Sequence, residues 1–157
     1  MTDAEKLVSV LTEKNMTVST AESCTGGLIS GAITSVPGSS AVFGYGFVTY
    51  ANDAKRRLTG VKPATLKKFG AVSSQTAFEM AVGARLTARS DYAVAATGIA
   101  GPDGGSDEKP VGLVYVAVAS KNSVVVRENV FSGGRAEIRT QTVEEALKLL
   151  LSEITGG

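Results

Sequence analysis

Apolar residues along the chain switch repeatedly between helical and strand spacing. Leu7 and Leu11 lie one helical turn apart behind a capping-box sequence at residues 2–5, so a first helix is predicted to end near Asn15. The same spacing predicts further helices over 28–36, 52–58, 62–70 and 73–86, and a final helix that follows Ser132-Gly133-Gly134-Arg135. Strands are predicted over 16–21, 43–50, 92–97, 113–119 and 124–131.

This order of elements predicts one fold class. Helices that alternate with strands are typical of an α/β protein, in which helices cover both faces of a sheet. Lys121-Asn122 lies between the last two strands and predicts a hairpin turn, which makes the sheet mixed instead of wholly parallel. The 157 residues match the size of one domain, and no repeat or linker divides them. We therefore expect a single-domain, three-layer α/β/α sandwich over residues 1–157.

Composition places the chain among ordinary globular proteins. Apolar residues make up 43% and charged residues 20%, and the net charge of +1 gives no general attraction to nucleic acid. Cys24 is the only cysteine, which excludes an internal disulfide and fits a reducing compartment. The N-terminus has no signal-peptide pattern, and no apolar run approaches the roughly 20 residues that span a bilayer. We expect a cytoplasmic protein with neither a membrane nor a nucleic acid as partner.

The sequence contains no histidine, and this absence narrows the possible chemistry. It removes Ser-His-Asp and Cys-His catalysis, histidine-ligated zinc and histidine acid–base chemistry. The spacing of Asp103, Asp107 and Glu108 is not that of a calcium loop, so no metal site and no cofactor is predicted. The base of an enzyme with this sequence must be lysine, aspartate, glutamate or tyrosine.

Ligands in open α/β sheets bind beyond the carboxyl ends of strands. Three such loops have unusual compositions, at 22–27, 50–57 and 98–105. In the first loop, Gly26 and Gly27 fall in the expected first turn of a helix, where each costs about 1 kcal/mol relative to alanine. Glycines there let a ligand approach free N–H groups, with Ser23 beside it as a nucleophile. Alternatively, Ser23 or Thr25 simply caps the helix, and Cys24 is a rival nucleophile or a small buried residue.

The second loop supplies a candidate base. Lys55 falls in the first turn of a helix that Asn52 is expected to cap, where the helix dipole disfavours a cation, and Arg56 and Arg57 lower its pKa further. A neutral lysine can deprotonate a serine, but lowering its pKa to ~7.5 requires about 4 kcal/mol, most of which burial must supply. Tyr50 is placed to share or relay the proton. In the alternative interpretation, Lys55 and the two arginines form a solvated basic face.

The third loop is rich in glycine but matches no phosphate-binding motif. It lacks the GK[ST] ending of a P-loop and the spacing of a dinucleotide fingerprint. It can still form a backbone nest for phosphate, and Arg135 is a candidate phosphate clamp. The alternatives are a plain connection between two strands and a surface arginine.

Five segments together resemble one family. They are AESCTGG at 21–27, GFVTYANDAK at 46–55, GAVS at 70–73, GIAGPDGGSDEKPVG at 98–112 and FSGGR at 131–135. Over nearly its whole length the sequence resembles the CinA C-terminal domain family, which includes nicotinamide-nucleotide amidases. The resemblance implies an anticodon-binding-domain-like α/β/α fold. It also implies metal-independent hydrolysis of nicotinamide mononucleotide to nicotinate mononucleotide and ammonia.

The resemblance also implies roles for individual residues. Ser23 is implied as the nucleophile, Lys55 as the base and Tyr50 as their neighbour, and N–H groups near 25–27 are expected to hold the oxyanion. The residues predicted to contact the nucleotide substrate are Thr25, Gly26, Gly27, Asn52, Thr97, Gly98, Gly101, Gly104, Gly105 and Arg135.

Two other functions compete with hydrolysis. The same loops suit a nucleotide-binding module that does not turn its ligand over, and the family's name suggests an interaction protein of competence or DNA-damage responses. We also expect a homo-oligomer, a dimer or larger, because such assemblies are common among small enzymes.

Overall fold

The computed structural model describes residues 1–157 and contains one five-stranded sheet. The strands, in sheet order, are β2 (Phe43–Val48), β1 (Val18–Glu22), β3 (Tyr92–Gly98), β4 (Leu113–Ala119) and β5 (Val124–Val130). The first three strands in this order run parallel, whereas β4 is antiparallel to both β3 and β5. The predicted mixed sheet is therefore confirmed, including the hairpin formed by β4 and β5.

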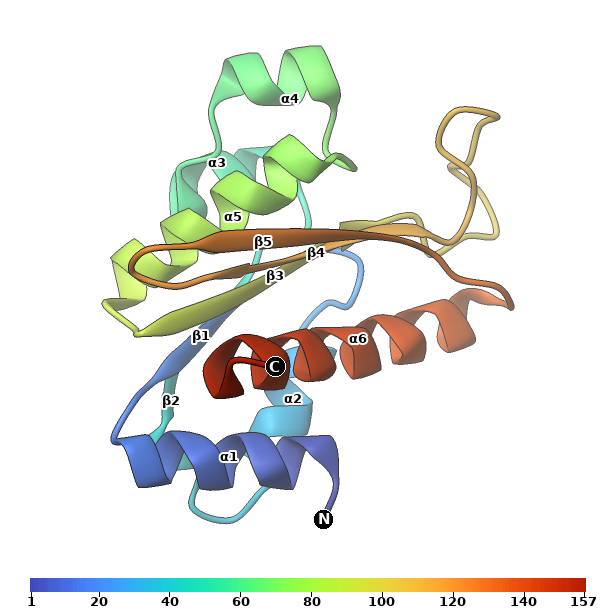
Figure 1. Cartoon of the computed structure of the whole chain (residues 1–157). Coiled ribbons are helices and arrows are strands. Elements are labelled where there is room, and N and C mark those ends of the chain that lie inside the picture. The colour runs from blue at the N-terminus through green and yellow to red at the C-terminus, as the bar shows by residue number, and fades with distance from the viewer.

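Helices cover both faces of this sheet (Figure 1). The helices are α1 (Asp3–Lys14), α2 (Leu28–Thr34), α3 (Asn52–Thr59), α4 (Pro63–Phe69), α5 (Ser74–Ala88) and α6 (Arg135–Thr155), with a 3₁₀ turn η1 at Ser39–Ala41. Figure 1 shows α1, α2 and α6 on one side of the sheet, and α5 on the other side with α3 and α4 beyond it. The arrangement confirms the predicted single-domain, three-layer α/β/α sandwich.

The two faces of the sheet are packed differently. The α1/α2/α6 face has a core cluster of 21 buried residues rich in leucine, isoleucine and valine. The α5 face has a cluster of 10 buried residues, eight of which are alanine. Because alanine side chains are short, α5 lies close to the sheet. Helix α3 packs against α5.

The longest helix, α6, packs one side on the sheet and on α1 and α2. Its first residue, Arg135, lies at the sheet edge where the strands β1, β2 and β3 end, and Arg139 follows one turn later. No helix in the structure is both long enough and apolar enough to cross a membrane.

Helix α3 is held against α5 by a contact that requires glycine. A Cβ added at Gly83 of α5 would lie 1.6 Å from the carbonyl oxygen of Thr59, at the end of α3. No real Cβ can occupy that position, so any larger residue must push the two helices apart. The contact matters because α3 also carries Lys55.

We expect Gly83→Ala to lower the free energy of unfolding by about 1–3 kcal/mol, because α3 must move to accept the methyl group. Gly31→Ala is the matched control, since Gly31 lies inside α2 and its added Cβ would meet nothing within 4 Å. Alanine is favoured over glycine inside a helix by about 1 kcal/mol, so the control should be equally or more stable than the native chain. Urea unfolding of both variants checks this, and an undiminished stability of Gly83→Ala would contradict the close contact.

Two local predictions about helix starts are wrong. Ala51, not Asn52, is the N-cap of α3, and Asn52 is the first helical residue. Gly26 and Gly27 precede α2 instead of lying in its first turn, with φ angles of 58° and 111°. These left-handed angles favour glycine, so the pair turns the chain into the helix and does not weaken the helix itself.

Candidate active site

The loops after β1, β2 and β3 meet at one edge of the sheet, because these strands are parallel and their carboxyl ends point the same way. They enclose a pocket of about 280 Å³. Its lining includes nine of the predicted site residues, namely Ser23, Tyr50, Asn52, Lys55, Thr97, Gly98, Gly101, Gly104 and Arg135. Four others, Thr25, Gly26, Gly27 and Gly105, do not line it.

Lys55 and Ser23 form a hydrogen-bonded pair in the wall of this pocket. The distance from Lys55 Nζ to Ser23 Oγ is 3.0 Å, and the lysine is only 1% exposed. Nζ also lies 2.8 Å from the carbonyl oxygen of Thr49 and 3.1 Å from that of Tyr50. No carboxylate pairs with this lysine, because both ion pairs of the structure belong to Asp53.

The three neighbours of Lys55 Nζ fit either protonation state of the amine. An ammonium group donates one hydrogen to each of the three oxygens. A neutral amine donates two hydrogens to the carbonyl oxygens of Thr49 and Tyr50, which can only accept, and its lone pair then accepts from the hydroxyl of Ser23. The site therefore loses no hydrogen bond when the lysine gives up its proton, and the neutral form leaves the serine proton aimed at a base.

Burial lowers the pKa of Lys55 from 10.5 to about 8, and the nearby Cys24 thiol opposes this shift slightly. Desolvation disfavours the charged amine, and no buried acid compensates for it. The predicted direction agrees with the structure, but not every predicted cause does. Arg56 and Arg57 do not contribute to the shift, because both extend into solvent and are held by Asp53.

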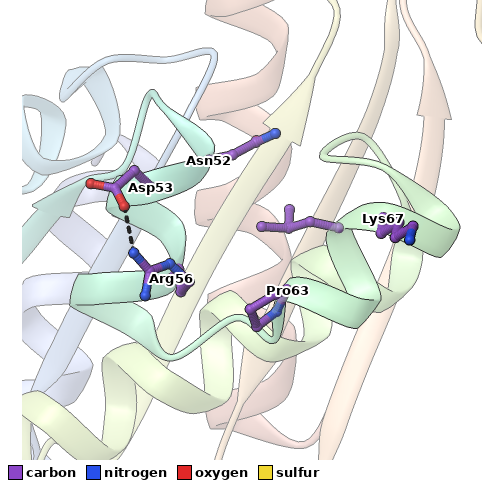
Figure 2. Close-up of a pocket in the computed structure, with 6 residues that line it drawn as sticks. Asn52, Asp53, Arg56, Pro63 and Lys67 are labelled. Carbon is purple, nitrogen blue, oxygen red and sulfur yellow. Dashed lines mark hydrogen bonds and ion pairs between the residues drawn. The ribbon is translucent and has the colours of Figure 1, made fainter.

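A second pocket, of about 480 Å³, lies between α3 and α4 and meets the first one at Asn52. Figure 2 shows Asn52, Asp53 and Arg56 on α3 and Pro63 and Lys67 on α4, with Asp53 turned towards Arg56. Asp53 accepts hydrogen bonds from Arg56 at 2.7 Å and from Arg57 at 2.9 Å, and these contacts lower the pKa of its carboxyl group. The solvated basic face considered above therefore exists for the two arginines, whereas Lys55 is buried and its Nζ faces Ser23 in the wall of the first pocket.

The buried side chain of Glu22 holds the loop that carries Ser23 in place. The sequence did not predict this role. Glu22 is fully buried at the end of β1. One carboxylate oxygen accepts from Thr25 Oγ1 at 2.6 Å and from Ile29 N–H at 2.8 Å, and the other accepts from Ser30 N–H at 2.9 Å and Ser30 Oγ at 2.7 Å. Glu22 thus occupies the positive N-terminus of α2 and satisfies its free amides.

This capping changes the predicted oxyanion site. The N–H groups at the start of α2 are already used, and Gly26 N–H is bonded to Ser23 O. Neither Ser23 nor Thr25 caps α2, because Gly27 holds the N-cap position. The amides of Cys24, Thr25 and Gly27 donate to no other residue, and of these three residues only Cys24 lines the pocket, so its amide is the candidate donor beside Ser23.

Cys24 itself does not fit a nucleophile. The residue is 5% exposed, and burial raises the pKa of its thiol to about 11, opposed in part by a hydrogen bond from its own main-chain amide and with smaller effects of neighbouring charges. The thiolate, which is the nucleophilic form, is therefore scarce near neutral pH. Cys24 is the small buried residue that the sequence suggested.

Arg135 ties two of the site loops together. Its guanidinium donates to Gly101 O at 2.8 Å and to the hydroxyl of Tyr50 at 3.0 Å. Tyr50 therefore contacts Lys55 through its main-chain carbonyl, while its exposed hydroxyl is engaged by Arg135. This geometry places Tyr50 at the pocket rim and gives no support to a proton relay through its hydroxyl.

The β3–β4 loop forms the remaining wall of the pocket and projects from the sheet edge in Figure 1. Buried Thr97 donates its hydroxyl to Ala71 O at 2.8 Å and so links β3 to the segment before α5. Gly98 has no room for a side chain, because an added Cβ would lie 2.5 Å from Val114 Cγ2. Gly105 packs back on Val111 of its own loop, away from the pocket.

The fold and the pocket define an α/β domain with a buried serine–lysine pair at the carboxyl edge of a mixed sheet. Residues 2–154 match the family described as the CinA C-terminal domain. The chain belongs to this family, as its five sequence segments predicted.

Solved structures of other family members have the same fold. The competence/damage inducible protein CihA from Agrobacterium tumefaciens is 53% identical and superposes with a TM-score of 0.93, covering 97% of this chain and 96% of that one. A CinA superfamily protein from Klebsiella pneumoniae is 30% identical with a TM-score of 0.94, covering 99% and 97%.

Curated relatives are longer than this chain. A protein of Acetivibrio thermocellus, named as competence-damage inducible, is 57% identical over 141 residues, which are 90% of this chain and 34% of the relative. One from Caldicellulosiruptor bescii is 53% identical over 150 residues, 96% of this chain and 36% of the relative. The chain thus spans about a third of the length of these relatives. Both relatives are named for competence and damage, and neither name specifies a reaction.

Proposed function

We propose that the protein is an amidohydrolase that converts nicotinamide mononucleotide to nicotinate mononucleotide and ammonia. The observation that carries this proposal is Lys55, a buried amine without an acidic partner, in hydrogen-bond contact with Ser23 Oγ. A chain without histidine needs another base to activate a serine, and a lysine with a lowered pKa is such a base. The choice of nicotinamide mononucleotide as the substrate rests on the family resemblance.

The reaction follows from the positions of these groups. Neutral Lys55 takes the Ser23 proton as Oγ attacks the carboxamide carbon, and the oxyanion forms within reach of the Cys24 amide. Lys55 then gives the proton to the departing nitrogen, so that ammonia leaves and an acyl-serine remains. Water attacks this ester with Lys55 again as the base, and the acid and the free serine are regenerated. Arg135, at the pocket mouth, is the proposed contact for the nucleotide phosphate.

Ammonia release from nicotinamide mononucleotide tests the proposal. We expect the purified protein to form ammonia and nicotinate mononucleotide in equal amounts. The competing proposal is a module that binds the nucleotide without turnover. Calorimetric binding with no ammonia formed would favour that module and contradict the amidase.

The pH dependence of the rate tests the role of Lys55. Below its pKa of about 8, the neutral fraction of Lys55 rises about tenfold with each pH unit. Since kcat/KM reports the free enzyme, log kcat/KM should rise with a slope near +1 up to about pH 8 and then level off. A flat profile across this range, or one that falls with pH, would contradict a lysine base.

A further inference from the structure

A tight turn joins β1 to the segment before α2, and a side chain from α6 binds the main chain of this turn. Gly26 donates its N–H to Ser23 O at 3.0 Å, which closes a β-turn of four residues. Cys24 and Thr25 are its central residues. Arg139 donates from Nε to Cys24 O and from Nη2 to Thr25 O, both at 3.1 Å. The guanidinium therefore spans the centre of the turn that begins with Ser23.

The two carbonyl groups depend on Arg139 to different degrees. Thr25 O also accepts from the N–H of Leu28 at 3.0 Å. Cys24 O accepts from Arg139 alone, although Cys24 is buried, and a buried carbonyl normally has a donor. This carbonyl belongs to the central peptide of the turn, whose orientation distinguishes the types of β-turn. Arg139 thus restrains the main chain of Cys24, whose amide is the candidate oxyanion donor.

Arg139 has no other polar partner in the structure. Its side chain is half-buried, belongs to neither ion pair and makes only these two hydrogen bonds. Burying a cation without a carboxylate is costly, and here only main-chain oxygens compensate for it. Arg139 does not line the pocket, so it can affect the reacting atoms only through the turn.

The positive charge of Arg139 also acts close to the nucleophile. Burial raises the pKa of the Cys24 thiol, and among the neighbouring side chains the charge of Arg139 opposes this rise most strongly. The same charge favours a negative charge that develops on an oxyanion beside the Cys24 amide. The contact is therefore both geometric and electrostatic.

We propose that Arg139 is a positioning residue, which holds the turn so that the Ser23 hydroxyl and the Cys24 amide keep the geometry that hydrolysis needs. Arg135, one helical turn earlier, binds the loops after β2 and β3 through its contacts with Tyr50 and Gly101. The start of α6 thus binds all three loops of the site. The catalytic part of this role rests on the proposed function, whereas the contact with the turn does not.

Kinetics of three variants test the catalytic part. Arg139→Met should lower kcat for ammonia release from nicotinamide mononucleotide about 10²-fold with KM little changed, because the misplaced groups act in the reaction and the substrate does not touch Arg139. Arg139→Lys should be impaired similarly, since lysine keeps the charge but lacks the planar fork. Arg127→Met is the matched control, exposed on β5, and should turn over at the native rate. A native kcat in either Arg139 variant, or a loss confined to KM, would overturn the positioning role.

Labelling of Cys24 tests the contact without the reaction. Cys24 is the only cysteine, so its modification by Ellman's reagent in the folded protein reports how often the turn opens. We expect Arg139→Met to be labelled at least about tenfold faster than the native protein and Arg127→Met, because it lacks two hydrogen bonds from a charged group. This increase should exceed any that the loss of global stability in urea explains.

The two readouts separate this proposal from the proposed function. Equal labelling rates would show that Arg139 does not hold the turn, even in an active amidase. If the native protein releases no ammonia, the proposed function fails and the catalytic part of the role of Arg139 fails with it. The labelling comparison then still decides whether Arg139 holds the turn.

Discussion

Replacement of Ser23 by alanine is expected to reduce ammonia release from nicotinamide mononucleotide by at least about 10³-fold, with the fold intact. The hydroxyl is the proposed nucleophile, and loss of a nucleophile removes nearly all catalysis beyond binding and oxyanion stabilisation. The substitution is conservative for folding, since the only hydrogen bond of Ser23 Oγ is the one with Lys55 Nζ. Initial rates and circular dichroism measured on the same preparation check both statements.

Ser123→Ala is the control for this experiment. Ser123 is an exposed residue in the β4–β5 turn, and its only hydrogen bonds are made by its main chain. Its replacement should leave the rate unchanged. Turnover by Ser23→Ala at the native rate would exclude the serine mechanism.

The second large effect concerns stability. A folded-state pKa of about 8, against 10.5 for the unfolded chain, means that the native protein binds its Lys55 proton more weakly than the unfolded protein does. The folded state is therefore penalised below about pH 8, and the penalty disappears as the pH rises towards 10.5. This shift corresponds to about 3 kcal/mol.

Lys55→Met isolates this contribution, because methionine has similar length and no charge. Relative to the variant, the native protein should gain about 3 kcal/mol of unfolding free energy between about pH 7 and pH 10.5. Other titrating groups affect both proteins alike, so their contributions cancel in the difference. Denaturant unfolding at several pH values measures it, and a difference that does not change with pH would show that Lys55 is charged in the folded state.

The pairing of Ser23 with Lys55 was predictable because both follow strands whose carboxyl ends meet at one edge of the sheet. The neutral state of Lys55 was only partly predictable from the sequence. Helix position and neighbouring arginines are visible in the sequence, but they do not shift the pKa here. Burial does, and burial depends on how α3 packs against α5 and β2.

The missed role of Glu22 has a similar cause. Its partners Ile29 and Ser30 lie seven and eight residues ahead, and they reach it only because Gly26 and Gly27 turn the chain with left-handed angles. When those glycines are assigned to the helix, this return path disappears. The helix N-terminus is then left open to a substrate anion, whereas in the structure the Glu22 carboxylate already fills it.

The titration of Lys55 in the folded protein tests the account most directly. In protein with isotope-labelled lysine, the Cε resonance of Lys55 can be assigned by its absence from Lys55→Met and followed by NMR as the pH changes. We predict a midpoint near 8. A midpoint near 10.5, the value of a solvated lysine, would contradict a neutral base beside Ser23.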